Sequence, residues 1–145
     1  MVDIIKASYD DLESVYSLLK LVSLPIDGVA DNFHNFFVLW EKNQLQGCAG
    51  IEIYDEIGLL RSVAVHPSFQ GQGLGQKLVE TIQRFSIEKG LTEIYLLTET
   101  AERFFLKLNY VVISRDEADD KVKQSIEFIS LCPISAVCMV KRLTE

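Results

Sequence analysis

The loop from Gln70 to Gly75, which reads Gln-Gly-Gln-Gly-Leu-Gly, holds the residues whose types and spacing most clearly indicate chemistry. Glycine has no side chain, so a phosphate can approach its backbone N–H closely. The loop precedes a segment with helical spacing, and the N-terminus of a helix carries partial positive charge. The pattern Gln70-x-x-Gly73-x-Gly75 therefore predicts an anion site, with pyrophosphate as the expected ligand.

A glycine-rich turn can also bind a different nucleotide or simply connect two elements, and the turn alone leaves these readings open. Two nucleotide-binding fingerprints fit less well. The dinucleotide fingerprint needs G-x-G-x-x-G early in a βαβ unit, whereas here Gly71, Gly73 and Gly75 follow a region of antiparallel strands. A Walker loop needs Gly-Lys-Ser/Thr, which the loop lacks.

The elements around the loop are predicted in the order strand, glycine turn, helix, strand. Residues 59–65 and 92–98 have strand character, and residues 75–89 have an apolar helical face that Gly90 ends. This order predicts a βαβ unit. The other expected elements are a strand at 2–7, a helix at 10–22 capped by Ser8, hairpin strands at 36–40 and 47–54, a short helix through Leu108 capped by Thr100, a strand at 110–114, a helix within 116–129 and a last strand at 135–141.

These elements predict a mixed α/β fold, with a mostly antiparallel central sheet flanked by helices, in a single domain of residues 1–145. The net charge of −7 and the absence of a basic cluster argue against a nucleic-acid partner. The sequence has no apolar run long enough to span a membrane and no signal-peptide pattern, so a cytoplasmic protein is expected. Three cysteines without CxxC spacing favour reduced thiols over a disulfide framework or a zinc site.

Residues 60–75 resemble the acetyl-CoA motif of the GNAT acetyltransferases, Q/R-x-x-G-x-G/A preceded by a strand that ends V-x-P. The similarity extends over nearly the whole chain. More narrowly, residues 58–65, 95–98 and 131–136 resemble small GNAT proteins associated with arsenic-resistance operons. That second resemblance does not establish that the protein acts on an arsenical.

The resemblance implies acetyl-CoA as cosubstrate and no metal. It implies that the backbone of residues 63–65 faces the pantetheine arm, since pantetheine amides can pair with a strand edge, and that amides of the glycine loop cradle the pyrophosphate. The cofactor-binding positions that it predicts are Val63, Ala64, Val65, Gln70, Gly71, Gly73, Leu74, Gly75, Gln76, Thr98 and Phe105.

Acetyl transfer to an amine needs the amine to be neutral and a proton source for the leaving thiolate. Many GNAT proteins have a tyrosine that protonates the leaving thiolate, and Phe105 stands at that place here. A thiol has a pKa of only about 8.5, so the thiolate can leave without a strong acid. Ser62, Thr98 and Thr100 are candidate hydroxyl donors, and the alternative for each is an ordinary strand or capping role. Glu52 is the candidate base, against a glutamate that faces solvent, and the turn residue Glu56 is a weaker one.

Arg61 interrupts an apolar strand just before the donor motif, where a guanidinium can bind an acceptor carboxylate; the alternative is an edge-facing or salt-bridged arginine. Cys132 invites a thiol-chemistry hypothesis, but an inert cysteine is favoured, and Cys138 is expected to be buried. His34 and His66 lack partners at ligand spacing, so structural roles are expected for both.

The sequence thus predicts acetyl transfer from acetyl-CoA to the primary amine of a small molecule, by direct attack in a ternary complex. An amino acid or an amino-acid-like toxic compound is the expected acceptor. The alternatives are a protein or peptide N-acetyltransferase, a CoA-binding regulatory module that has lost catalysis, and a thiol-based arsenical sensor. Both a monomer and a homodimer are compatible with the sequence.

Overall fold

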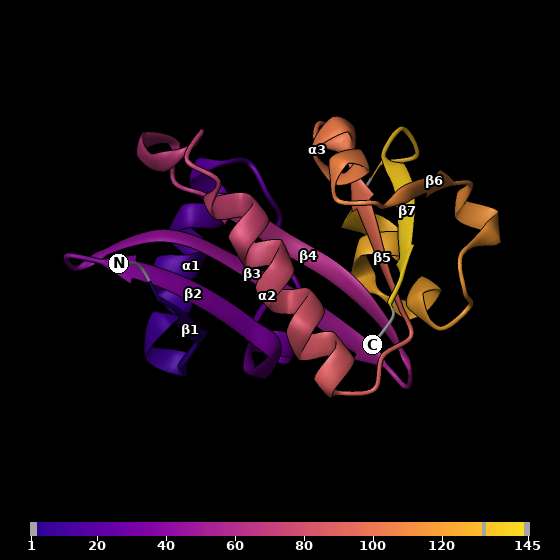
Figure 1. The fold of residues 1–145 in the computed structure, drawn as a ribbon, viewed down its shortest axis with the longest axis horizontal. Helices are drawn as coiled ribbons and strands as arrows, with labels where there is room; N and C mark the ends of the chain where they lie inside the picture. Colours follow the sequence, from indigo (N-terminus) through magenta and orange to yellow (C-terminus); the bar gives the residue numbers. More distant parts are fainter. Residues whose placement is uncertain (1–2, 132, 144–145) are drawn as a thin grey trace. The chain divides into compact units, whose positions relative to one another are not determined.

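The computed structural model describes residues 3–131 and 133–143, and in these ranges it shows a seven-stranded mixed sheet with the strand order β1-β2-β3-β4-β5-β7-β6 (Figure 1). Of the described pairings, β4 with β5 is parallel, and β1 with β2, β2 with β3, β5 with β7 and β6 with β7 are antiparallel. This confirms the predicted mixed α/β class. The strands are β1 (Ile4–Lys6), β2 (Phe36–Glu41), β3 (Gln44–Tyr54), β4 (Ile57–Val65), β5 (Glu93–Thr98), β6 (Val111–Ile113) and β7 (Val137–Arg142).

Helices occupy much of the chain between the strands. They are α1 (Leu12–Leu21), α2 (Leu74–Glu88) and α3 (Glu102–Lys107), with short turns of 3-10 helix at Tyr9–Asp11, Ala30–Asn35, Pro67–Phe69, Arg115–Glu117 and Val122–Gln124, and a π turn at Glu127–Leu131. The chain divides into two compact units. The first unit is residues 1–51 with 61–84, and the second is residues 52–60 with 85–145.

In the first unit, a two-residue turn joins β2 and β3. Lys42 and Asn43 have φ angles of 51° and 65°, the left-handed conformation that tight hairpin turns require. The register pairs Glu41 with Gln44 directly across this turn. The hairpin was predicted, but β3 begins at Gln44 and not at Gly47, because the turn is shorter than the sequence suggested.

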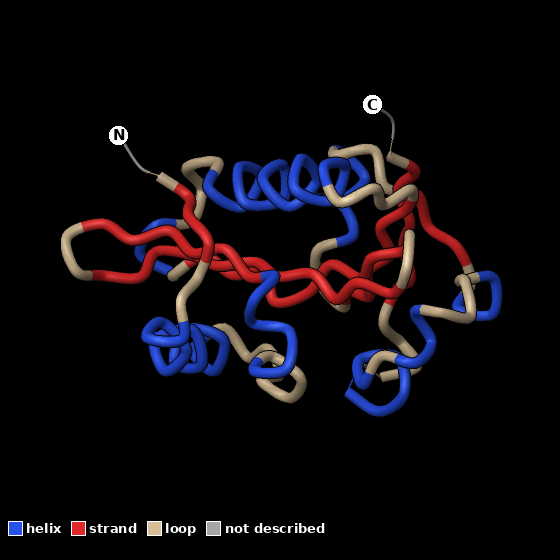
Figure 2. Tube along the Cα trace, turned by 90° about the horizontal axis from the view of Figure 1, so that it is seen from below, coloured by secondary structure: helices blue, strands red, loops and turns tan. Residues whose placement is uncertain are grey.

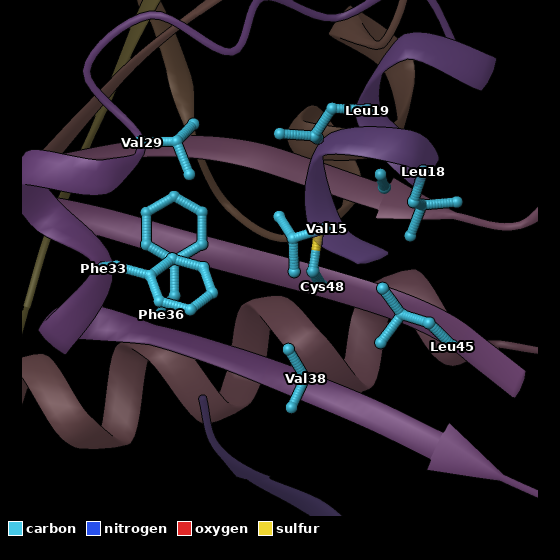
Figure 3. Close-up of a cluster of buried hydrophobic side chains, with 10 residues drawn as sticks. Val15, Leu18, Leu19, Val29, Phe33, Phe36, Val38, Leu45 and Cys48 are labelled. Carbon is cyan, nitrogen blue, oxygen red and sulfur yellow. The ribbon is translucent and has the colours of Figure 1, made fainter. Parts of the chain in front are cut away.

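One face of these strands is closed by α1 and the segment that follows it (Figure 3). Leucines and valines at helical spacing on α1 point into an apolar cluster with side chains of β2 and β3, and Figure 2 shows α1 and the long helix α2 on opposite sides of the strands of this unit. Burial of this many aliphatic and aromatic groups is the main stabilising term of the unit. The cluster contains Val15, Leu18, Leu19, Val29, Phe33, Phe36, Val38, Leu45, Cys48 and Ala64.

The helix α2 follows the glycine loop and carries its own buried stripe. Leu74, Leu78, Val79 and Ile82 are all nearly inaccessible to solvent, at the spacing expected for one helical face. The sequence predicts a helix core made of Leu78, Val79, Ile82, Phe85 and Ser86, and the burial of all five confirms it. The helix ends before Gly90, whose φ of 83° is the left-handed conformation typical of a helix C-terminus.

In the second unit, β7 lies between β5 and β6. Six residue pairs join β5 to β7, and three join β6 to β7. The parallel pairing of β4 with β5 runs from Ile57–Glu93 to Leu59–Tyr95, which confirms the predicted βαβ unit. A second apolar cluster includes Tyr95, Val122 and Cys138, so the expected burial of Cys138 is confirmed.

Two local predictions in this unit are wrong. Thr100 does not cap α3: the helix begins at Glu102 with Ala101 at the N-cap, and the N–H of Ala101 bonds to the Thr98 hydroxyl at 3.0 Å. The single helix expected within 116–129 is replaced by short helical turns. Charged residues with local side-chain bonds, such as Ser114 N–H to Glu117 at 3.0 Å, favour such turns over a continuous helix.

The close pairing of Gly50 with Phe36 gives a test of this packing. A Cβ at Gly50 would lie 2.2–2.4 Å from three atoms of the Phe36 ring, and that ring is fully buried. Gly50→Ala is expected to lower the free energy of unfolding by about 1–3 kcal/mol through overpacking. Urea unfolding measures the loss. The penalty must shrink in a Phe36→Leu background, and strictly additive effects of the two substitutions would contradict the assigned contact.

Candidate functional site

The strand β4 has an irregular backbone at Ser62, which we call the bend of β4, just before the residues that the sequence assigned to the cofactor. Ser62 has a φ of 59°, which places a non-glycine residue in the left-handed region inside a strand. This conformation costs about 1–2 kcal/mol for an L-residue, so the surroundings must hold it. One contact comes from its neighbour: the Nε of Arg61 donates to the Ser62 hydroxyl at 3.0 Å.

Residues 46–48 of β3, which we call the β3 seat, contact the end of β4 and the residue that follows it. The carbonyl of Gln46 accepts from the N–H of His66 at 2.8 Å, and the thiol of Cys48 donates to the carbonyl of Ser62 at 3.3 Å. Between them, Gly47 allows a close approach. A Cβ at Gly47 would lie 3.0 Å from the carbonyl oxygen of Ala64.

The turn after β4 is fixed by its own side chains. The Nδ1 of His66 accepts from the N–H of Ser68 at 3.1 Å, and its ring packs on Phe69 at 5.7 Å between centroids. The side chain of Gln70 donates back to the carbonyl of Val65 at 3.0 Å. The glycine loop therefore starts from a defined position relative to the end of β4, and His66 has the structural role expected for it.

The loop then makes two left-handed steps and enters α2. Gly71 and Gly73 have φ angles of 84° and 82°, and no heavy atom lies within 4 Å of a Cβ built on either. The requirement for glycine is thus conformational, not one of space. The N–H of Lys77 bonds to the carbonyl of Gly73 at 3.2 Å, so the amides before Lys77 have no partner within the helix. Those amides form the positive end of the helix dipole.

Most of the predicted cofactor residues are brought together here, in the first unit. Leu74 is buried and anchors the start of α2, whereas Gln76 is exposed and donates to the Glu80 carboxylate at 3.1 Å. The other predicted positions lie just before α2 in the chain. They are Val63, Ala64 and Val65 at the end of β4 and the loop from Gln70 through Gly75. A helix N-terminus after such a loop is a general type of anion site, and the anion site itself stays a prediction.

The proposed base Glu52 belongs to the second unit, on β3. Its side chain is 2% exposed, so the alternative of a glutamate facing solvent is wrong. The hydroxyl of Tyr54 donates to its carboxylate at 2.6 Å. A buried, hydrogen-bonded carboxylate is compatible with proton transfer and equally with a structural role.

Arg61 is 3% exposed, so it is not an edge-facing arginine. Its Nε is committed to Ser62, and Ser62 is itself 9% exposed. The role of Arg61 in binding an acceptor carboxylate and that of Ser62 as a hydroxyl donor stay predictions. The sequence did not reveal that the backbone of Ser62 has a left-handed conformation and forms the bend of β4.

Thr98 and Phe105 lie in the second unit, and their predicted contact with the cofactor stays a prediction. Phe105 is buried, with its ring against Phe104 and Tyr110 at 5.0 and 5.5 Å between centroids. The hydroxyl of Tyr110 is buried and has no hydrogen-bond partner among the described residues. Burial raises the pKa of Tyr110, so this phenol stays protonated.

The thiols and possible metal ligands give no second site in the described ranges. Cys48 and Cys138 are free and buried, and burial raises their pKa values to about 12 and about 11. The hypothesis about Cys132 falls outside the described residues. In the part of the chain that the structure describes, no three His, Cys, Asp or Glu residues gather as metal ligands, and no helix is both long and apolar enough to cross a bilayer.

A cavity of about 410 Å³ lies in the second unit, beside β6 and β7. None of the predicted site residues lines it. Its walls combine charged and aliphatic groups, and they do not resemble the backbone amide cradle of the first unit. The lining residues are Glu93, Asn109, Val111, Val140, Lys141 and Arg142.

Comparison with known proteins identifies the family. The family model described as an acetyltransferase (GNAT) domain matches residues 32–112, which is more than half of the 145-residue chain. The chain belongs to the GNAT acetyltransferase family. The matched range contains the β3 seat, the bend of β4 and the glycine loop, so the structural features described above lie within this acetyltransferase domain.

Relatives in sequence are also acetyltransferases. An uncharacterized N-acetyltransferase of Chlorobaculum tepidum is 29% identical over 123 residues, covering 81% of this chain and 77% of its own length. The amino-acid acetyltransferase of Escherichia coli K12 is 23% identical over 128 residues, which is 82% of this chain but 29% of that enzyme. These findings and the domain match make the protein an N-acetyltransferase of the GNAT type.

Solved structures show the same fold at low sequence identity. N-acetylglutamate synthase from Neisseria gonorrhoeae, in complex with coenzyme A and N-acetyl-glutamate, superposes with a TM-score of 0.85 at 19% identity, over 100% of this chain and 36% of that one. A Mycobacterium tuberculosis protein in complex with CoA superposes with a TM-score of 0.81 at 19% identity, over 98% and 99% of the two chains. Both likenesses confirm the GNAT fold of this chain.

Sequence reasoning missed the β3 seat. Of its residues, Gly47 gave a usable signal, because an isolated glycine in a strand marks a bulge or a close backbone approach. Cys48 gave no such signal, since a buried cysteine usually behaves as a small apolar residue. The Ser62 bend also has no residue-type signature, because serine is not enriched in the left-handed region.

The exposed pair of Glu56 and Lys121 tests whether Glu56 is structural. Lys121 Nζ lies 2.6 Å from the Glu56 carboxylate, and this hydrogen bond lowers the pKa of Glu56. A lowered pKa in the folded state stabilises the fold above the unfolded value of about 4.3, and the stabilisation is lost as pH falls through the folded value. Glu56→Gln should therefore be less stable than the wild type in urea at pH 7, and the difference should shrink as the pH falls below about 4.3.

Glu88→Gln, at an exposed position at the end of α2, is the control for that comparison. It should not share the loss of stability that Glu56→Gln shows at pH 7. Acetyl transfer by Glu56→Gln should stay within about twofold of the wild type, because an exposed ion pair contributes little. A large loss of turnover in Glu56→Gln at unchanged stability would contradict the structural role.

Proposed function

We propose that the protein transfers the acetyl group of acetyl-CoA to the primary amine of a small, amino-acid-like molecule. The observation that carries the proposal is the glycine loop: two left-handed glycines, Gly71 and Gly73, stand directly before α2 and present its free backbone amides. A diphosphate fits such a cradle because it offers several anionic oxygens to parallel N–H donors.

The donor is proposed to lie along the end of β4 and the glycine loop. The amides of Gly71, Gly73, Gly75 and Gln76 hold the pyrophosphate, and the backbone of residues 63–65 pairs with the pantetheine amides. Support comes from the fixed geometry of this stretch, in which Gln70 ties the loop to Val65. The two solved neighbours with CoA in their complexes also have this fold.

In the proposed reaction a neutral amine attacks the thioester carbonyl carbon of acetyl-CoA. The C–N bond forms, the C–S bond breaks, the amine loses one proton and the leaving thiolate takes up one. The thiolate needs little acid assistance, because the pKa of a thiol is about 8.5. This agrees with Phe105 at the position where many family members have a tyrosine.

We assign the role of proton acceptor to Glu52. The Tyr54 hydroxyl donates a hydrogen bond to this carboxylate and orients it. Glu52→Gln should lower kcat by about a hundredfold, the smaller end of general-base effects. Tyr54→Phe, which keeps the carboxylate, should change kcat much less. Urea unfolding of both variants reports any loss of folding. An unchanged kcat in a folded Glu52→Gln protein would remove Glu52 from the mechanism.

The acceptor class is proposed from the relatives. Several of them are amino-acid acetyltransferases, and one solved neighbour is an N-acetylglutamate synthase. This chain spans under a third of the length of those amino-acid acetyltransferases, so their substrates cannot be transferred to it directly. An acceptor with a primary amine and a carboxylate, or its phosphinic or arsenical analogue, is the class that we expect.

The experiment is CoA release, detected with a thiol reagent, from acetyl-CoA and a panel of acceptors. The panel contains amino acids, their phosphinic and arsenical analogues, polyamines and short peptides. Release that depends on an amino acid or an analogue supports the proposal. Release that depends on peptides alone would replace it with protein or peptide acetylation.

A second candidate, a CoA-binding module without turnover, is motivated by Phe105, which supplies no hydroxyl. Saturable acetyl-CoA binding by calorimetry together with no release from any acceptor would favour this candidate. Any acceptor-dependent release would exclude it. The same titration with CoA alone compares the affinity of the protein for the product CoA with its affinity for the donor acetyl-CoA.

The glycine loop can be tested with a matched pair of substitutions. Gly73 and Gly90 have nearly equal φ angles of 82° and 83°, and a Cβ at either position meets no heavy atom within 4 Å. Gly73→Ala and Gly90→Ala should each lower stability by about 1 kcal/mol because alanine is strained at positive φ. Gly73→Ala alone should also weaken acetyl-CoA binding, by about tenfold or more, since the strained residue turns its amide away. Equal affinities in calorimetry would contradict the assignment.

A further inference from the structure

The thiol of Cys48 is an enclosed hydrogen-bond donor aimed at the bend of β4. Its side chain is fully buried in the cluster between α1 and the strands (Figure 3), and its Sγ lies 3.3 Å from the carbonyl oxygen of Ser62. Burial raises the pKa of Cys48 to about 12, so the sulfur keeps its proton at physiological pH. A protonated thiol donates, whereas a thiolate does not.

The acceptor of this bond is the carbonyl of the residue that bends the strand. A residue in the left-handed conformation turns its carbonyl out of the regular strand pattern, and a buried carbonyl without a donor costs free energy. Cys48 supplies a donor at that point. The Ser62 side chain is held separately by Arg61, so the bend is fixed at both its side chain and its backbone.

Residues next to Cys48 on β3 hold the following part of β4 in the same way. Gln46 accepts from His66, and a side chain at Gly47 would approach Leu78 to 2.9 Å as well as Ala64. The β3 seat thus lies against Ser62 and Ala64 of β4 and against His66, the residue that follows the strand. These contacts border the stretch that the proposed function assigns to the pantetheine arm.

We propose that Cys48 is a positioning residue for the acetyl donor: its thiol holds the Ser62 carbonyl and so sets the direction of the backbone groups of residues 63–65. The inference rests on the proposed function for what those groups bind. It adds a residue on a neighbouring strand that touches neither donor nor acceptor. Cys48 is too enclosed for nucleophilic or arsenical chemistry, which needs an accessible thiolate.

Two variants distinguish the effect of the S–H hydrogen bond from the effect of the size of the side chain. Cys48→Ala removes the S–H group, and Cys48→Ser replaces it with a hydroxyl that can still donate. Cys138→Ala is the matched control, because Cys138 is the other buried free cysteine in the described ranges and is 2% exposed on β7. Arg61, Ser62 and Glu52 stay unchanged in all three proteins.

The first measurement is the Kd of acetyl-CoA by calorimetry, together with kcat at saturating donor. Cys48→Ala should raise the Kd about fivefold, the factor that corresponds to one weak hydrogen bond. The kcat of this variant should change less than twofold, because the reacting groups are intact. Cys48→Ser and Cys138→Ala should stay within about twofold of the wild-type Kd, by the same argument.

The second measurement is amide hydrogen exchange of the ligand-free protein, read at His66, whose N–H bonds to Gln46. Cys48→Ala should speed this exchange about fivefold beyond any change in global stability, and Cys138→Ala should not. An unchanged Kd and unchanged His66 exchange in Cys48→Ala would overturn the inference, as would an equal effect of Cys138→Ala. If the wild type binds no acetyl-CoA, the proposed function fails, and the exchange result still decides whether Cys48 holds the strand.

Discussion

The left-handed conformation of Ser62 is the constraint on which the rest of the site depends. A nine-residue strand does not bend in this way without compensation, because the conformation is unfavourable for any residue except glycine. The compensation comes from Arg61, which bonds to the serine side chain, and from Cys48, which bonds to its carbonyl. The apolar cluster under α1 encloses Cys48 and keeps that bond away from water. Core packing and site geometry are therefore parts of one arrangement in this unit.

Beyond the bend, a short loop connects the end of β4 to the N-terminus of α2. Gln70 ties the turn to the end of β4, and two glycines make the left-handed steps that the turn requires. The first amides of α2 have no acceptor within the helix, because its hydrogen bonds begin with the N–H of Lys77. In a protein with a net charge of −7, such a cradle is a local source of positive potential for an anionic ligand. The proposed binding of the diphosphate by backbone groups is compatible with the acidic charge of the chain.

The sequence predicted the parts of this molecule that depend on local patterns. Alternation and helical spacing located the β4–α2–β5 unit, and the glycine loop was recognised from its residues because left-handed turns favour glycine. The sequence could not predict the bend at Ser62 or the thiol bond from Cys48, because both depend on tertiary contacts between neighbouring strands. Glu52 illustrates the same limit. Alternation within β3 did not reveal that both faces of the strand are covered, so its burial was not foreseen.

The central claim is that the backbone amides of the glycine loop hold the diphosphate of the donor. Titration of ¹⁵N-labelled protein with acetyl-CoA, followed by two-dimensional NMR, tests it directly, because the amide shift of each residue reports hydrogen bonding to an anion. The account predicts saturable and large downfield shifts for the amides of Gly71, Gly73, Gly75 and Gln76, and small shifts for the amide of Gly90. Saturable shifts confined to other parts of the chain, with these four amides unmoved, would contradict it.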